Sequence, residues 1–119
     1  MKISERHHND VTILDVAGKV TIGRGDVELR DAIAAALHRG SRNILLNLEK
    51  LRKIDSSGVG ELVAARSSVA LHGGELKLVN LSPKVSDVLH MTQIMTVLEV
   101  YDDEAAALAT FERKLAAVG

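Results

Sequence analysis

The stretch KIDSSGVGEL, at residues 53–62, places Ser56 and Ser57 between an aspartate and two glycines. These residue types could form a nucleophile, a phosphate-binding loop, a helix cap or a site of modification. The structural interpretation is a cap, because Asp and Ser are favoured at helix N-termini and glycine permits close packing or turning. One side chain is enough for a cap, so the surplus polar group also favours a functional role, without deciding which.

The surrounding sequence argues against a catalytic serine. A serine hydrolase needs an oriented base and an oxyanion hole, and DSSGVG differs from the G-x-S-x-G nucleophile elbow. The GRG sequence at residues 23–25 lacks the Lys and the Ser or Thr that end a P-loop, so it predicts a turn. No spacing singles out one histidine as a base; the five are His7, His8, His38, His72 and His90. We therefore predict that the protein is not an enzyme.

Metal and cofactor sites are not predicted either. The histidines form no i, i+4 pair on one predicted helix, and the chain has no cysteine to supply a thiolate ligand or a disulfide. We assign no metal and no cofactor.

The composition is that of one compact domain, which we place at residues 1–119. Hydrophobic residues make up 46% of the chain and charged residues 26%, which is typical of a soluble globular protein. A net charge of -1 and 2% aromatic residues argue against direct nucleic-acid binding and against attraction to anionic membranes. The N-terminus shows no signal segment and the chain has no long apolar span, so we expect a cytoplasmic protein without membrane insertion.

The elements that must position the serines alternate along the chain. Strands are predicted at residues 2–8, 11–17, 43–48, 75–80 and 96–101, and helices from Asp26 to Gly40, at 57–72, at 83–90 and from Asp102 or Asp103 through Leu115. Residues 18–25 are predicted to form a loop with at most a short extended piece. This alternation predicts an α/β fold with a mixed, largely parallel sheet. We place the strand at 43–48 in the centre of the sheet, so that the serines follow its carboxyl end, where ligands and partners meet such folds.

Three segments together resemble a known family. LNLEKLRKIDSSGVGELVAA, HGGELKLVNLSPKVSDVLHMT and VYDDEAAAL are similar to the STAS domain, in particular to stand-alone bacterial anti-sigma-factor antagonists. The likeness covers nearly the whole chain, and its most specific part is the junction at residues 54–60. It implies a mixed sheet of about five strands with four helices packed mainly on one side.

The resemblance also implies a function. In such proteins the unmodified antagonist binds an anti-sigma factor that is also a serine kinase, and this binding releases sigma. The kinase phosphorylates the first serine after the aspartate, which breaks the complex, and a PP2C-type phosphatase restores it. On this pattern the phosphorylated residue is Ser56. The expected partner-binding residues are Asp55, Ser56, Ser57, Gly58, Thr21 and Glu61. We expect the free protein to be a monomer.

Two positions depart from what is expected. The family often has acidic residues after the glycine that ends the second strand, but Gly18 is followed here by Lys19, Val20 and Thr21, which points to a different partner surface. Arg66 falls within the apolar arc of the helix at 57–72. Either its stem packs while its head reaches water, or it pairs with a carboxylate, for which Asp15 is a candidate.

A second interpretation stays open. The chain could be a STAS subunit of a larger signalling or transporter assembly. In that case the segment around Ser56 and Ser57, which we call the serine loop, docks without being phosphorylated. A nucleotide or lipid ligand at the same loop is a third possibility, for which the sequence offers no pocket-specific residue.

Overall fold

The computed structural model describes residues 1–118, with side chains described through residue 111, so the side chain of Leu115, in the last predicted helix, lies outside the described side chains. The strands are β1 (Lys2–His8), β2 (Val11–Val20), β3 (Asn43–Asn47), β4 (Leu51–Ile54), β5 (Glu75–Val79) and β6 (Glu99–Tyr101). The helices are α1 (Gly25–His38), α2 (Ser56–Leu71), α3 (Pro83–Met91) and α4 (Glu104–Val118).

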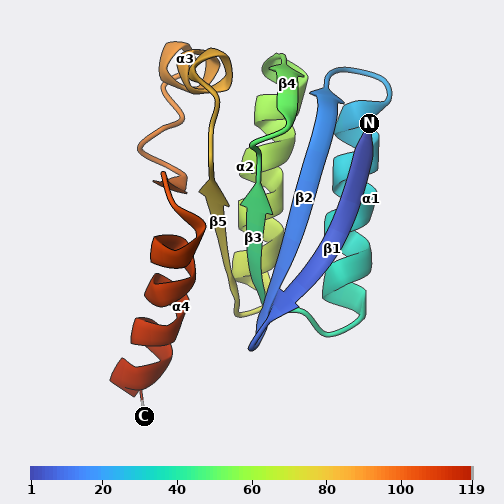
Figure 1. Cartoon of the computed structure of the whole chain (residues 1–119). Helices are drawn as coiled ribbons and strands as arrows, with labels where there is room; N and C mark the ends of the chain where they lie inside the picture. Colours follow the sequence, from blue (N-terminus) through green and yellow to red (C-terminus); the bar gives the residue numbers. More distant parts are fainter. Residues whose placement is uncertain (119) are drawn as a thin grey trace.

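The strands form one mixed, largely parallel sheet, as predicted (Figure 1). Its order is β1-β2-β3-β5-β6, with β4 paired to the end of β2. Among the described pairs, only the β1–β2 hairpin is antiparallel. The pairs β2–β3, β2–β4, β3–β5 and β5–β6 are parallel. The carboxyl ends of the parallel strands therefore lie at the same end of the sheet, and the serine loop lies at this end.

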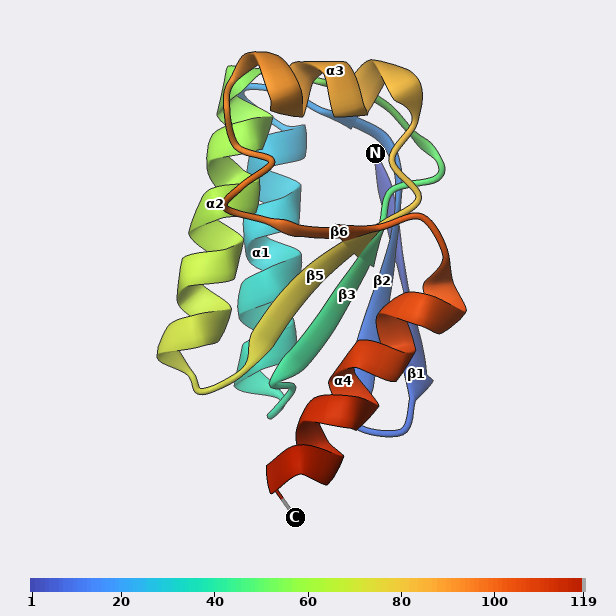
Figure 2. The same cartoon turned by 90° about the vertical axis from the view of Figure 1, so that its left-hand side faces the viewer.

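The helices lie on both faces of the sheet (Figure 2). α1 and α2 pack on one face, where they share the larger apolar core with the sheet and α3, which lies across the end of the molecule. α4 covers the other face through Ala107, Leu108 and Phe111. Three of the four helices therefore contribute to the core on one side, in agreement with the expectation that the helices pack mainly on one side, and α4 is the one on the other face. β3 is buried on both faces because Ile44 and Leu46 enter the first core and Leu45 enters the second.

The sheet has six strands, whereas about five were predicted, because β4 was missed. Its sequence, LRKI, is buried only at its two ends, so it shows neither the alternation nor the apolar run by which a strand is recognised. β2 also continues past Gly18 to Val20, through residues that were predicted to form a loop. The last predicted strand is shorter than expected, since only Glu99–Tyr101 pairs with β5.

Most helix boundaries lie close to the predicted ones and carry recognisable caps. Ser82 caps α3 by accepting from the Val85 N–H, and Gly40 adopts a φ of 99° after α1. Asp103 accepts from the Ala106 N–H at the start of α4. Asp26 was the exception, since α1 begins at Gly25 and the buried Asp26 carboxylate accepts from the Val27 N–H inside the first turn.

Candidate functional site

The site is organised by Asp55, the residue before the two serines. Its Oδ1 accepts a hydrogen bond from the Gly58 N–H at 3.0 Å, which caps α2. Its Oδ2 accepts from the Ile22 N–H at 3.0 Å, in the loop between β2 and α1. The bond from Ile22, followed by that from Gly58, holds the pKa of the Asp55 carboxyl below its usual value of 3.8. Asp55 therefore remains ionised at neutral pH and joins the start of α2 to the β2–α1 loop.

Gly58 allows α2 to begin against the end of β2. A Cβ at this position would lie 2.1 Å from the Val20 carbonyl oxygen and 2.6 Å from a side-chain atom of Ile54. No other residue fits there without moving backbone. Gly60 is different, because a Cβ there would meet no atom within 4 Å. Of the two glycines in DSSGVG, the first is required by packing.

The two serines are presented differently. Ser56 is the first residue of α2 and is exposed, while Ser57 is half-buried. A partner or a modifying enzyme therefore reaches Ser56 more readily than its neighbour. The serines follow β4 and not the central strand β3, which corrects the predicted layout. Because β4 pairs with β2, this arrangement brings the serines to the β2–α1 loop.

Thr21 lies in the same loop, next to the residue that binds Asp55. It is half-buried, and its carbonyl accepts from the Asp26 N–H at 3.1 Å. The structure thus brings Thr21 together with four of the other predicted contact residues, which are Asp55, Ser56, Ser57 and Gly58.

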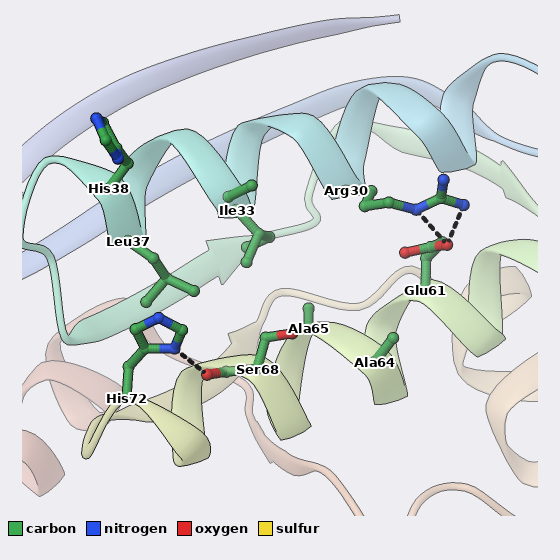
Figure 3. Close-up of a pocket in the computed structure, with 10 residues that line it drawn as sticks. Arg30, Ile33, Leu37, His38, Glu61, Ala64, Ala65, Ser68 and His72 are labelled. Atoms are coloured by element: carbon green, nitrogen blue, oxygen red, sulfur yellow. Dashed lines mark hydrogen bonds and ion pairs between the residues drawn. The ribbon is translucent and has the colours of Figure 1, made fainter.

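Glu61 stands apart from this group. Its Oε1 accepts two hydrogen bonds from the Arg30 guanidinium, at 2.7 and 3.0 Å, and the Glu61 side chain is only 14% exposed (Figure 3). The carboxylate therefore joins α2 to α1, and only a small part of it is open to a partner.

A hollow of about 460 Å³ runs between α1 and α2, and nothing in the sequence predicted it. The Arg30–Glu61 ion pair lies at one end, and His38 and His72 lie at the other (Figure 3). Ile33, Ala65 and other small or apolar side chains line the space between them. Neither Ser56 nor Ser57 lines this hollow, so the hollow is separate from the serine loop.

Ile22 is a site residue that the sequence did not reveal. Its N–H is held by Asp55, and its side chain is 74% exposed beside the serine loop. The only available signal was a single aliphatic residue within the glycine-rich stretch TIGRG.

Arg66 is exposed, which agrees with the first of the two expected environments. The pairing with Asp15 was wrong, because that carboxylate accepts from Arg6 at 2.6 and 2.8 Å and from Asn47 at 2.8 Å. The hydrogen bonds from Arg6 lower the Asp15 pKa. The buried residues of α2 are Gly58, Val59, Leu62, Ala65 and Val69.

The described residues offer neither a metal site nor a membrane-spanning helix. They contain no group of three or more His, Cys, Asp or Glu side chains placed to hold a metal ion. Among their helices, none combines the length and the apolar character needed to cross a bilayer.

Comparison with known proteins identifies one family. The model of the STAS domain matches residues 2–107. The anti-sigma F factor antagonist of Paenibacillus polymyxa is 28% identical to this chain, over 94% of this chain and 96% of the relative. The crystal structure of the Thermotoga maritima protein TM1081 is 26% identical, with a TM-score of 0.82 over 91% of this chain and 92% of that one.

The anti-sigma factor antagonist SpoIIAA shares the fold, and the structure of its phosphorylated form is of the Bacillus protein. Its unphosphorylated form aligns with a TM-score of 0.69 at 20% identity, over 94% of this chain and 98% of that one. Its phosphorylated form aligns with a TM-score of 0.67 at 21% identity, over 92% and 99%.

Proposed function

Because this chain belongs to the STAS domain family, we propose that it is an anti-sigma factor antagonist that is controlled by phosphorylation of Ser56. The observation that carries the proposal is the exposed Ser56 at the first position of α2, on a helix start that Asp55 fixes. The name of the Paenibacillus polymyxa relative supports the antagonist role. The two forms of SpoIIAA support the view that this fold accepts phosphate.

In this proposal, the protein works as one domain and, when free, as a monomer. Its unphosphorylated form binds an anti-sigma factor that is also a serine kinase and thereby releases sigma. The contacts are made by Asp55, Ser56, Ser57, Gly58, Thr21 and Glu61. The kinase transfers phosphate to Ser56, the complex separates, and a PP2C-type phosphatase regenerates the binding form. No catalytic activity of this chain is part of the proposal.

The physics of phosphorylation at this position supports a switch in binding. A phosphoserine adds roughly -1.5 to -2 charges at neutral pH, and the N–H groups at the start of a helix are favourable neighbours for an anion. The fold therefore tolerates the group. At an interface the same phosphate brings bulk, a desolvation cost and repulsion from facing carboxylates. Each tenfold loss of affinity requires only about 1.4 kcal/mol, so no unfolding is needed.

The docking-subunit alternative is not favoured, because the relatives are named as antagonists. It makes a distinct prediction, since a permanent subunit elutes with its assembly when native extract is separated by size.

Phosphopeptide mapping of the protein from its own cells, with stressed and unstressed cultures compared, tests the proposal. We expect phosphate on Ser56, with an occupancy that changes between the cultures. A Ser56 that stays unmodified under every condition would refute the switch and favour a docking role for the loop. The neighbouring Ser57, which is less exposed, serves as the internal control within the same peptide.

A further inference from the structure

The surface beside Ser56 carries three exposed cations, which we call the cationic rim: Lys19, Arg52 and Lys53. The parallel pairing of β2 with β4 places Lys19 directly opposite Lys53. Lys53 precedes Asp55 by two residues, and Lys19 precedes Thr21 by two. The rim therefore borders the proposed contact residues on the side of β2 and β4.

Lys19 and Arg52 also face a common hollow of about 380 Å³, which Thr21 and Arg24 help to line. Because Thr21 is one of the proposed contact residues, the rim and the contact surface are continuous. This continuity extends the proposed contact surface from Thr21 to Lys19 and Arg52.

The acidic groups around this surface are already engaged within the protein. Asp55 accepts two backbone N–H bonds, Glu61 is bound to Arg30, and Glu28 pairs with Arg24 at 3.2 Å. Among the described residues, by contrast, no member of the cationic rim makes an ion pair. The three cations of the rim therefore outnumber Asp55, which keeps its negative charge while it accepts backbone N–H bonds, although the whole chain carries a net charge of -1.

An apolar side chain stands beside the rim. Ile22 is 74% exposed, and its backbone is held in place by the bond to Asp55. An exposed aliphatic side chain on a held backbone, next to polar groups, suits a protein interface, where an apolar centre is surrounded by a polar border.

We propose that the partner surface facing Ser56 is an apolar hollow for Ile22, bordered by Asp and Glu side chains that meet the cationic rim. This inference rests on the proposed function and specifies the chemistry of the partner. It also explains how the switch acts in this chain. Phosphate on Ser56 offsets the positive charge of the rim and lies opposite the partner's carboxylates. The attraction between the rim and the partner is thereby replaced by repulsion between the phosphate and those carboxylates. A protein is favoured over nucleic acid or lipid because three cations beside an aliphatic anchor, on a chain of net charge -1, give a weak polyanion site.

Carbodiimide cross-linking tests the proposal directly, because this reagent joins an amine to a carboxylate that contacts it. The tagged, unphosphorylated full-length protein is mixed with extract of its own cells, cross-linked and analysed by mass spectrometry. We expect Lys19 or Lys53 to be linked to an Asp or Glu of a captured protein. Links that involve only other lysines, or the absence of a captured protein, would overturn the proposal. Recovery of nucleic acid, or binding to phosphatidylglycerol vesicles in place of a protein, would overturn it as well.

Affinity measurements with the purified captured protein provide the second readout. The charge-reversed variant Lys19→Glu/Lys53→Glu should bind at least about tenfold more weakly, mainly through a slower association rate. Lys19→Arg/Lys53→Arg keeps the charge and should bind like the parent. Arg39→Glu makes a single charge reversal beyond the far end of α1 and should leave binding unchanged. Equal affinities for the parent and the charge-reversed variant would refute the acidic border.

The identity of the captured protein separates this inference from the proposed function. If Lys19 and Lys53 are linked to carboxylates of a protein that is not an anti-sigma factor, the proposed function fails while the chemistry assigned to the partner surface stands. If an anti-sigma factor is captured without these links, the proposed function stands and the cationic rim has no such role.

Discussion

At the scale of single residues, the two oxygens of Asp55 have separate tasks. One caps α2, and the other holds the β2–α1 loop through Ile22. With both oxygens engaged, the carboxylate acts by fixing the residues around it. Ser56 is thereby presented from a helix start whose position relative to Thr21 and Ile22 is set by one side chain.

Replacement of Asp55 should therefore lower stability. We expect Asp55→Ala to reduce the free energy of unfolding by about 1 to 2 kcal/mol, because the cap and the loop both lose their acceptor. Chemical denaturation at pH 7 measures this loss. Unchanged stability would show that the two hydrogen bonds contribute little.

The same carboxylate should make part of the stability depend on pH. Because its pKa is depressed in the folded protein, the stability that it contributes is fully present above the ordinary value of 3.8 and is lost as pH falls through the folded-state pKa. Asp55→Asn cannot titrate, so it is the matched control. We expect the unfolding free energies of the parent and Asp55→Asn to differ at pH 7 and to converge in acid. A constant difference across this range would contradict the assignment.

The site could be predicted in part from its residue types. DSSG at a predicted strand-to-helix junction identified the loop, but Asp and Ser are both favoured caps, so composition alone could not show which one caps α2. The exposed Ile22 and the Arg30 partner of Glu61 depend on contacts between segments that are distant in sequence. No local pattern carries that information.

At the scale of elements, the start of α2 is held against β2 at a distance that only glycine permits. Gly58→Ala should destabilise the protein by about 1 to 3 kcal/mol, since its Cβ would overlap the Val20 carbonyl. Gly60→Ala is the control in the same helix. It should stabilise by about 0.5 to 1 kcal/mol, because the site is open and alanine favours helix. Urea denaturation of both variants measures the contrast, and equal effects would show that the close approach does not matter.

The attachment of α4 to its face of the sheet involves a buried lysine. Lys77 on β5 has a side chain that is 4% exposed, and its Nζ donates to Thr110 of α4 at 2.7 Å and lies 4.5 Å from the centre of the Phe111 ring. Glu75 and Glu99 lie at 3.5 and 3.4 Å from the same nitrogen. The packing of the Lys77 side chain and its positive charge can therefore both contribute to holding α4 on the sheet.

Two substitutions of Lys77 separate packing from charge. Lys77→Met keeps most of the volume, and the Glu75 and Glu99 carboxylates that lose this cation have side chains that are 23% and 55% exposed, so we expect a change in unfolding free energy within about 1 kcal/mol. Lys77→Ala leaves a cavity under α4 and should cost about 2 to 4 kcal/mol. Thermal and urea unfolding measure both. A Lys77→Met variant as unstable as Lys77→Ala would mean that the ion pairs, and not the packing, secure the helix.

The elements themselves were predictable where one residue pattern dominated. The apolar stripe of α1 indicated a helix, and the apolar run of β3 indicated a buried strand. β4 could not be recognised, because it is short and exists through its pairing with the end of β2. The face on which α4 packs was likewise not encoded locally, since an amphipathic helix fits either side of a sheet.

At the scale of the whole molecule, the fold gathers the loop after β2, the short strand β4 and the start of α2 at the carboxyl edge of the sheet (Figure 1). The apolar cores lie beneath this edge, between the sheet and the helices on its two faces. A change at Ser56 therefore alters the surface without entering a core.

This separation of surface from core predicts that a negative charge at Ser56 leaves the fold intact. We expect Ser56→Asp to change the free energy of unfolding by no more than about 0.5 kcal/mol, since surface substitutions usually fall within that range and an acidic group suits a helix start. Urea denaturation measures the change. A large loss of stability would mean that modification acts by unfolding, contrary to a switch in binding.

The most direct measurement is the affinity of one purified anti-sigma factor from the same cells for the unmodified protein and for protein phosphorylated at Ser56. We predict tight binding by the unmodified form and a loss of at least about tenfold on phosphorylation, which corresponds to about 1.4 kcal/mol. Ser57→Ala should retain the difference between the two forms. Equal affinities for the unmodified and phosphorylated proteins would contradict the switch at Ser56.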